Sequence, residues 1–170
     1  MNLKNYKYIF LDRDGIVNDV IIRDSIISSP RYLSEFKFRK DFLDFAKNID
    51  KKYDFFLATN QPDIKRNLLK KDDLNEMHEK LKKLLVFKEL FVCMHDDEDN
   101  CECRKPKPGM ILKAMAKYNL KTDDCVMIGD SIKDIKAANS AGIDAFLLET
   151  NYNKHITFNN KIQSLTSLIK

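Results

Sequence analysis

Apolar residues occur along this chain in short blocks separated by polar stretches. Blocks of four to eight apolar residues that end in polar or turn residues are typical of buried strands. On this pattern we predict strands at residues 7–11, 53–58, 89–94, 125–128 and 143–148.

Between these blocks, apolar residues recur at the spacing of an amphipathic helix. We predict helices at residues 41–49, 72–85, 109–118 and 132–141, and a short final helix at about 162–168. Asp72 and Asp73 suit a helix start, and Gly142 suits a helix end. His78 is expected at the surface or boundary of its helix. Strands that alternate with helices favour a parallel α/β sheet with right-handed crossovers.

Residues 16–38 interrupt this alternation, because they show no clean helical period. Ser28-Ser29-Pro30 is a turn signal within them. We predict a flap here, hairpin-like or irregular, that covers the functional site.

Polar side chains follow several predicted strands. Asp12 and Asp14 come after the first strand, Thr59 and Asn60 after the second, and Asp130 after the fourth. In open parallel sheets, ligands bind beyond the carboxyl ends of the strands. We therefore expect these residues to converge. An ordinary turn after a strand is an alternative for Asp12 and Asp14, and it is the plainer interpretation of Thr59 and Asn60 taken alone.

The carboxylates suit phosphate chemistry. One Asp can attack phosphorus while another, two positions later, moves a proton. Three crowded carboxylates (Asp12, Asp14 and Asp130) repel one another unless a cation lies among them, and Mg²⁺ prefers oxygen ligands. Alternatively, Asp130 is only a helix N-cap. Asp134, one helical turn later, either supports Asp130 or lies at the surface.

Four residues suit phosphate binding. The hydroxyl of Thr59 and the amide of Asn60 can bond to phosphate oxygens. Arg104 and Lys105 can offset the charge of a phosphoryl group, and the two prolines that follow them make a floppy basic run less plausible.

A cluster of cysteines and histidine predicts a second metal. Cys93 and His95 are followed, after five residues, by Cys101 and Cys103. Three thiolates and one imidazole complete a closed tetrahedral Zn²⁺ site, which is structural because no position remains for water. Such a metal would fold the acidic loop and position the basic pair that follows it. Cys125 lies in an apolar block and is expected in the core.

Composition narrows the class of protein. The chain has 170 residues, 44% hydrophobic, which suits a single domain spanning residues 1–170. Charged residues of both signs are mixed along the chain, and their net charge is +4. This modest charge suits a small anionic ligand better than nucleic acid. No apolar run has the length of a signal sequence core or a membrane span. We expect a cytoplasmic monomer with no nucleic-acid or membrane partner.

Four segments together resemble the four motifs of the haloacid dehalogenase superfamily. They are Asp12-Arg13-Asp14-Gly15, Thr59-Asn60-Gln61, Arg104-Lys105-Pro106-Lys107-Pro108-Gly109-Met110 and Gly129-Asp130. The cysteine and histidine pattern is similar to one branch, which holds heptose bisphosphate 7-phosphatases and histidinol-phosphatases. The resemblance covers about residues 7–148. It implies a Rossmann-like domain, with helices on both faces of the sheet and a minimal cap.

The resemblance also implies roles for individual residues. Asp12 would be the nucleophile that forms an aspartyl-phosphate, and Asp14 the general acid and then the base. Mg²⁺ would be held by Asp12, the backbone carbonyl of Asp14, and Asp130. Thr59, Asn60, Arg104 and Lys105 would bind the substrate, and Cys93, His95, Cys101 and Cys103 would hold structural Zn²⁺.

The function this implies is Mg²⁺-dependent hydrolysis of a small sugar phosphate, first of all D-glycero-D-manno-heptose 1,7-bisphosphate, on a nucleotide-heptose or surface-glycan pathway. Histidinol phosphate is an alternative substrate, and a non-catalytic zinc-stabilised binding module is an alternative function. The motifs depart from the usual pattern at Ile16, at Pro62-Asp63 and at Ser131. The last two affect the residues expected around the substrate.

The flap is expected to select the substrate. It carries Arg23 and Arg31, which are candidate partners for a second phosphate.

Overall fold

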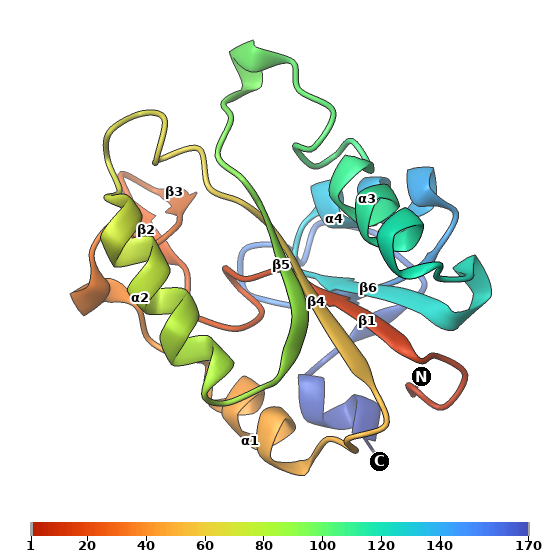
Figure 1. Cartoon of the computed structure of the whole chain (residues 1–170). Helices are drawn as coiled ribbons and strands as arrows, with labels where there is room; N and C mark the ends of the chain where they lie inside the picture. The colour runs from red at the N-terminus through yellow and green to blue at the C-terminus, as the bar shows by residue number, and fades with distance from the viewer. Residues whose placement is uncertain (1, 170) are drawn as a thin grey trace.

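The computed structural model describes residues 2–169, and a six-stranded parallel sheet forms its centre (Figure 1). The strand order is β5-β4-β1-β6-β7-β8. The strands are β1 Tyr8–Leu11, β4 Asp54–Asn60, β5 Phe87–Cys93, β6 Cys125–Gly129, β7 Asp144–Leu148 and β8 Lys161–Ile162. The five predicted strands are confirmed. The sixth, β8, was not predicted because its two residues form no apolar block.

The four long helices are also confirmed. They are α1 Lys40–Asn48, α2 Lys71–Lys82, α3 Gly109–Tyr118 and α4 Ile132–Ala141. The predicted final helix is instead a 3-10 helix, η4 Leu165–Ile169, which follows β8. Shorter 3-10 helices are η1 Leu33–Glu35, η2 Asp97–Asp99 and η3 Thr122–Asp124.

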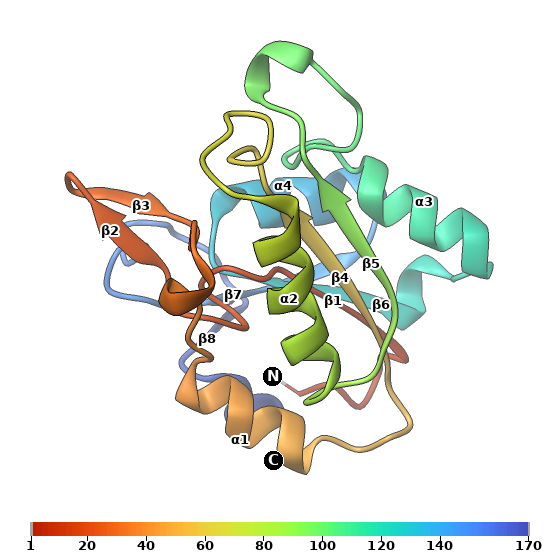
Figure 2. The ribbon, with the colours of Figure 1, turned by 60° about the vertical axis from the view of Figure 1, so that its left-hand side comes forward.

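The helices cover both faces of the sheet, as Figure 2 shows. Alternate residues of a strand point to opposite faces. Ile9 and Leu11 of β1 therefore pack in one apolar cluster with residues of α1, α2 and η4, while Phe10 packs in another with residues of α3 and α4. This arrangement confirms the expected α/β fold.

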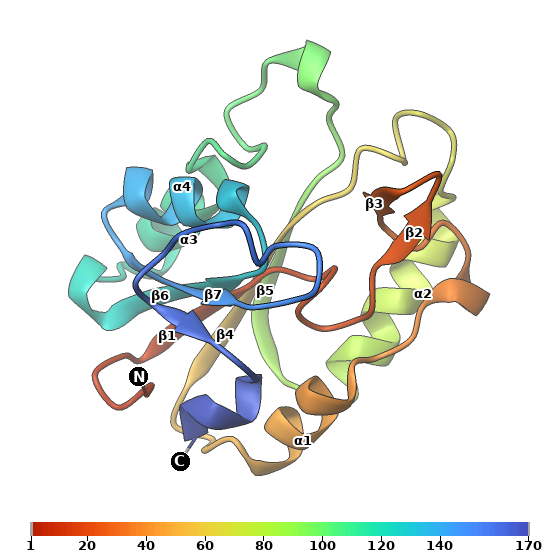
Figure 3. The same ribbon diagram turned by 180° about the vertical axis from the view of Figure 1, so that it is seen from behind.

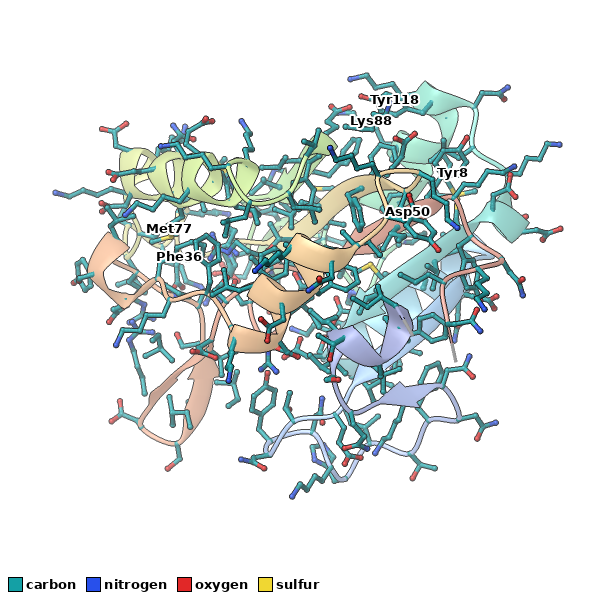
Figure 4. All side chains as sticks on the ribbon, turned by 90° about the horizontal axis from the view of Figure 1, so that it is seen from below. Tyr8, Phe36, Asp50, Met77, Lys88 and Tyr118 are labelled. Carbon is teal, nitrogen blue, oxygen red and sulfur yellow. The ribbon has the colours of Figure 1, made fainter. Side chains whose placement is uncertain are left out.

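A smaller cluster holds α2 against the segment that carries η1. Phe36 and Met77 belong to it, and Figure 4 shows their side chains near each other beside α2. The neighbouring His78 is buried, with 6% of its surface exposed, so its expected place at the helix boundary was wrong. The apolar spacing of the helix gave no sign of how closely the segment that carries η1 covers it.

The predicted flap contains a β-hairpin. Strands β2 (Ile21–Arg23) and β3 (Ile26–Ser28) pair antiparallel, and Asp24 and Ser25 between them both have positive φ. Two such residues make the turn whose twist suits a tight hairpin. Figure 2 shows the hairpin standing apart from the central sheet.

Within residues 2–169, no helix has the length and apolar character needed to cross a bilayer.

Candidate active site and metal centres

The topology places Asp12 between two neighbouring strand ends. Strand β1 pairs with β4 on one side and β6 on the other, with Leu11 opposite both Leu57 and Ile128. The backbone N–H of Asp12 donates to the Ile128 carbonyl at 3.0 Å, which extends the pairing by one residue. The strand order reverses here, because the chain goes from β1 to β4 and β5 on one side and continues with β6, β7 and β8 on the other, and ligand crevices form at such a switch point.

The predicted convergence of carboxylates is present, although its membership differs in one residue. Carboxylate oxygens of Asp12, Asp130 and Asp134 lie within 4.8 Å of one another. Lys105 joins them, with its Nζ 2.9 Å from Asp12 Oδ1 and 2.5 Å from Asp134 Oδ1. Two of the three acidic groups, Asp12 and Asp134, thus share one buried ammonium group.

This crowding changes how the acids titrate. Burial raises the pKa of Asp12 to about 6, because the charge of Lys105 offsets only part of that effect and the carboxylates of Asp134 and Asp14 add to it. Burial, followed by repulsion from Asp134 and Asp12, raises the pKa of Asp130 well above its ordinary value. Buried carboxylates whose negative charge is not fully compensated by protein groups favour the binding of a cation.

The donor set fits Mg²⁺ at Asp12 and Asp130. Both oxygens of Asp134 are already engaged, Oδ1 by Lys105 and Oδ2 by the backbone N–H and hydroxyl of Ser131. Asp134 is 1% exposed, so the alternative that it lies at the surface was wrong; it caps α4 through Ser131 and holds Lys105. Hard oxygen donors remain on Asp12 and Asp130, as Mg²⁺ requires.

Asp14 lies in a separate polar network, away from the carboxylate cluster. Its oxygens accept hydrogen bonds from Asn18 Nδ2 at 2.9 Å, Ser29 Oγ at 2.8 Å and Gln61 Nε2 at 2.8 Å. Arg13, which is fully buried, forms an ion pair with it at 3.0 Å. Burial opposes ionisation of Asp14, but the charge of Arg13 and these donors together lower its pKa.

The predicted phosphate-binding residues lie around the same strand ends. The amide of Asn60 binds the backbone of Lys105 twice, donating to its carbonyl at 2.9 Å and accepting from its N–H at 3.1 Å. Thr59 is buried and accepts from Gln61 Nε2 at 3.0 Å. Asn60 therefore fixes the loop that delivers Lys105 to Asp12.

The four zinc candidates come together at the end of β5. The Sγ atom of Cys93 lies 3.6 Å from His95 Nδ1, 3.7 Å from Cys101 Sγ and 3.3 Å from Cys103 Sγ. The edges of a tetrahedron with Zn–S and Zn–N bonds of ordinary length are about 3.5–3.8 Å. The geometry and the donor types both suit Zn²⁺.

Charged contacts tie the zinc-candidate loop to the cavity. Arg104 Nε donates to Asp97 at 2.6 Å and Nη1 to the His95 carbonyl at 3.3 Å. Arg66 Nη2 donates to Asp96 at 2.6 Å. Arg104 and Arg66 both line the cavity, so the loop positions two of its cationic groups.

The cavity has a volume of about 670 Å³ and contains Asp12, Asp14 and Asp130 in its wall. Arg31 also lines it, and its Nε donates to Asp63 at 2.8 Å. Arg23 instead pairs with Glu35 and donates to the Ser29 carbonyl at 2.9 Å, away from the cavity wall. Of the two flap arginines, only Arg31 is therefore placed to contact a ligand there.

Several site residues had no predicted role. Arg13 and Gln61 lie inside two of the motifs, so their positions were a signal that could have been used. Ser29 on the flap and Tyr152 after β7 contact Asp14 and Asp130 respectively, yet neither belongs to a chemical pattern in the sequence. Their contacts depend on how two distant segments fold back.

Comparison with known proteins places this arrangement in a family. Residues 102–163 match the HAD-hydrolase-like family, the haloacid dehalogenase-like hydrolases. The D-glycero-beta-D-manno-heptose-1,7-bisphosphate 7-phosphatase of Neisseria meningitidis serogroup A is 34% identical over 141 residues, covering 80% of this chain and 73% of its own. The corresponding protein of Helicobacter pylori strain 26695 is 36% identical over 152 residues, with 84% and 83% covered.

A solved structure agrees with these relatives. The D,D-heptose 1,7-bisphosphate phosphatase from B. bronchiseptica, complexed with magnesium and phosphate, superposes with a TM-score of 0.83, 28% identity and 96% of each chain covered. A Campylobacter jejuni relative, named for the alpha anomer of the same bisphosphate, is 29% identical over 169 residues and covers 96% of this chain and 94% of its own. From its sequence, its fold and the strand-end acids, this chain belongs to the haloacid dehalogenase-like hydrolases, in the family of the D-glycero-D-manno-heptose-1,7-bisphosphate 7-phosphatases.

Proposed function

We propose that this protein is a Mg²⁺-dependent phosphomonoesterase that removes the 7-phosphate from D-glycero-D-manno-heptose 1,7-bisphosphate. The observation that carries the proposal is the position of Asp12, which lies at the central strand end, 2.9 Å from the buried Lys105 ammonium and within 4.8 Å of Asp130. A carboxylate in this position can attack phosphorus, and the ammonium group beside it can offset the charge of the phosphoryl group.

In the first step, an oxygen of Asp12 forms a bond to phosphorus as the bond from phosphorus to the sugar oxygen breaks. The sugar oxygen takes a proton from Asp14, and the phosphoryl group remains on Asp12 as an aspartyl-phosphate. Lys105 offsets the negative charge of the transferring group. When bound by Asp12, Asp130 and the backbone carbonyl of Asp14, Mg²⁺ would add further positive charge at the phosphate oxygens.

In the second step, water attacks the phosphorus of the aspartyl-phosphate and gives its proton to Asp14, which releases inorganic phosphate and restores the Asp12 carboxylate. The donors around Asp14 lower its pKa, so this residue is ionised in the resting site. That state suits the base of the second step, whereas the acid role requires Asp14 to take up a proton beforehand.

The substrate contacts come from the cavity wall. Arg104 and Lys105 supply cationic groups, and Asn60 lines the same wall at the neighbouring strand end. Thr59, the preceding residue, is buried and does not line the cavity. A bisphosphorylated sugar has two anionic ends, and the cavity wall holds further cationic groups on Arg31 and Arg66. We also propose that Zn²⁺ at Cys93, His95, Cys101 and Cys103 is structural, because it would leave no open coordination position.

The test is phosphate release from a panel that includes both anomers of the heptose bisphosphate, histidinol phosphate and p-nitrophenyl phosphate. We expect Mg²⁺-dependent turnover with preference for a heptose bisphosphate. Asp12→Asn should reduce turnover to background, because an amide is not a nucleophile toward phosphorus. Asp19→Asn, an exposed flap residue, is the matched control and should be as active as the wild type. Turnover by Asp12→Asn would remove Asp12 as the nucleophile.

A further inference from the structure

The segment between β7 and β8 folds back onto the strand end that carries Asp130, and Figure 3 shows its course over β6 and β7. The hydroxyl of Tyr152 donates a hydrogen bond to Asp130 Oδ2. The amide of the next residue, Asn153, donates to the backbone carbonyl of Asp130 at 2.7 Å. Asp130 is therefore held at its side chain and at its backbone by the same segment.

The turn that carries Tyr152 is fixed by hydrogen bonds of the Asn153 side chain. Asn153 is buried, and its Oδ1 accepts from the Thr150 N–H at 2.8 Å. Its Nδ2 also donates to the Leu148 carbonyl at 2.8 Å, at the end of β7. Every polar atom of this amide has a partner, so the turn is fixed to the sheet and the Tyr152 ring has a defined place beside Asp130.

Gly15 lies against both partners of this contact. Its φ of +83° favours glycine, and a Cβ there would overlap with the Asp130 carboxylate and lie 2.5 Å from the Tyr152 hydroxyl. The absence of a side chain at Gly15 thus leaves the room that the Asp130 carboxylate and the Tyr152 hydroxyl occupy. With Oδ2 engaged by Tyr152, Oδ1 is the oxygen that remains for a cation.

We propose that Tyr152 is a positioning residue that orients the Asp130 carboxylate toward Mg²⁺. This inference rests on the magnesium site of the proposed function. Groups that hydrogen-bond to a metal ligand restrict its orientation, and their removal commonly costs about 10- to 100-fold in metal affinity. Tyr152 itself lines the cavity, so a substrate contact is the competing role that the experiment must separate.

The experiment compares two variants that each lose one hydroxyl. Tyr152→Phe removes the contact with Asp130 and keeps the ring. Tyr6→Phe removes a similar contact, from Tyr6 to Asp144 Oδ2 at 2.8 Å, at the opposite end of the sheet. Mg²⁺ binding is measured by calorimetry without substrate, and thermal unfolding without Mg²⁺ checks that each variant is folded.

We expect the Mg²⁺ dissociation constant of Tyr152→Phe to rise about 10-fold or more, and that of Tyr6→Phe to match the wild type. With saturating Mg²⁺, kcat of Tyr152→Phe on p-nitrophenyl phosphate should return to the wild-type value. An unchanged Mg²⁺ dissociation constant in folded Tyr152→Phe would overturn the inference. If KM is raised or kcat is lowered at saturating Mg²⁺ while that constant is unchanged, Tyr152 contacts the substrate instead.

The same measurement separates this inference from the proposed function. If the wild type binds no Mg²⁺, the proposed magnesium site fails and the role of Tyr152 fails with it. If the wild type binds Mg²⁺ and Asp130→Asn does not, the site stands and Tyr152→Phe alone decides the inference.

Discussion

The ammonium group of Lys105 lies 2.9 Å from Asp12 Oδ1, although the two residues belong to different motifs, the first and the third along the chain. The side chain of Lys105 is 3% exposed, so water screens this pair poorly. Burial disfavours the charged form of Lys105, but the carboxylates of Asp12 and Asp134 outweigh that effect and raise its pKa. Lys105 therefore remains charged and holds two carboxylates that would otherwise repel each other.

Replacing Lys105 with Met should impair both folding and catalysis. Two buried carboxylates lose their cationic partner, and breaking such a pair costs about 3–5 kcal/mol of the free energy of unfolding. We expect kcat on p-nitrophenyl phosphate to fall about 100-fold or more, as when one charge-stabilising donor is removed. Urea denaturation and steady-state kinetics measure the two effects.

Lys107→Met is the control for this substitution. Lys107 pairs with the exposed Glu102 at 2.9 Å, and a surface pair contributes about 1 kcal/mol or less. Equal stability and activity of the two variants would contradict the role given to Lys105.

The sheet could be predicted because its strands bury continuous apolar residues. Phe55 to Ala58 in β4 and Cys125 to Ile128 in β6 are buried without interruption, which makes them visible in the sequence. Within residues 2–169, strand β8 pairs with β7 and with no other strand. Because β8 has no apolar run of its own, its formation depends on that tertiary contact.

The site could be predicted where it depends on parallel strand ends. Asp12 and Asp130 meet because β1 and β6 are neighbours, and a repeated pattern of strands followed by acids already indicates this. The donors to Asp14 and the contact of Tyr152 depend instead on loops that fold back over the sheet. Loop conformations carry no periodic signal, so these contacts could not be predicted from the sequence.

Loss of one of the four proposed zinc ligands should release the metal and loosen the loop. Cys101→Ala leaves three donors, and we expect zinc to fall from about one ion per chain to well below that, because a structural site needs all four. Metal binding stabilises the folded conformation of such loops, so the loop without metal should open more often. We therefore expect trypsin to cleave it faster near Arg104. Metal analysis and limited proteolysis provide the measurements.

Cys125→Ala is the matched control for the zinc experiment. Cys125 is buried in β6 and lies outside the four-residue cluster. Its variant should retain the full zinc content even if its stability falls. Retention of zinc by Cys101→Ala would show that Cys101 is not a ligand.

Arg31 should contribute to recognition of a second anionic group. Its Nε is held by the buried Asp63 at 2.8 Å, while the side chain lines the cavity that contains Asp12. Arg31→Gln should raise KM for the bisphosphate about 10- to 100-fold, the loss expected for a charged hydrogen bond. Turnover of p-nitrophenyl phosphate, which has no second phosphate, should be unchanged.

Arg23→Gln tests whether the loss of any flap charge has the same effect. Arg23 is paired with Glu35 and does not line the cavity, so this variant should keep the wild-type KM for both substrates. Equal changes in the two arginine variants, or an equal loss on both substrates in Arg31→Gln, would contradict a specific contact.

His78 should make the protein less stable in acid. Burial, together with the nearby charge of Arg13, lowers the pKa of His78 from 6.5 to about 4. Between these values the unfolded chain binds a proton that the folded chain does not, so stability is fully present above pH 6.5 and falls as the pH drops toward 4. At pH 5 we expect a loss of about 2 kcal/mol from this group.

His78→Leu removes that proton-binding group, along with a buried Nε2 that has no hydrogen-bond partner among the described residues. The free energy of unfolding of this variant, measured in urea at pH 7 and pH 5, should fall less on acidification than that of the wild type. His155→Asn, at an exposed histidine, should show the wild-type difference. If His78→Leu loses as much stability between the two pH values as the wild type, His78 is not the group that destabilises the fold in acid.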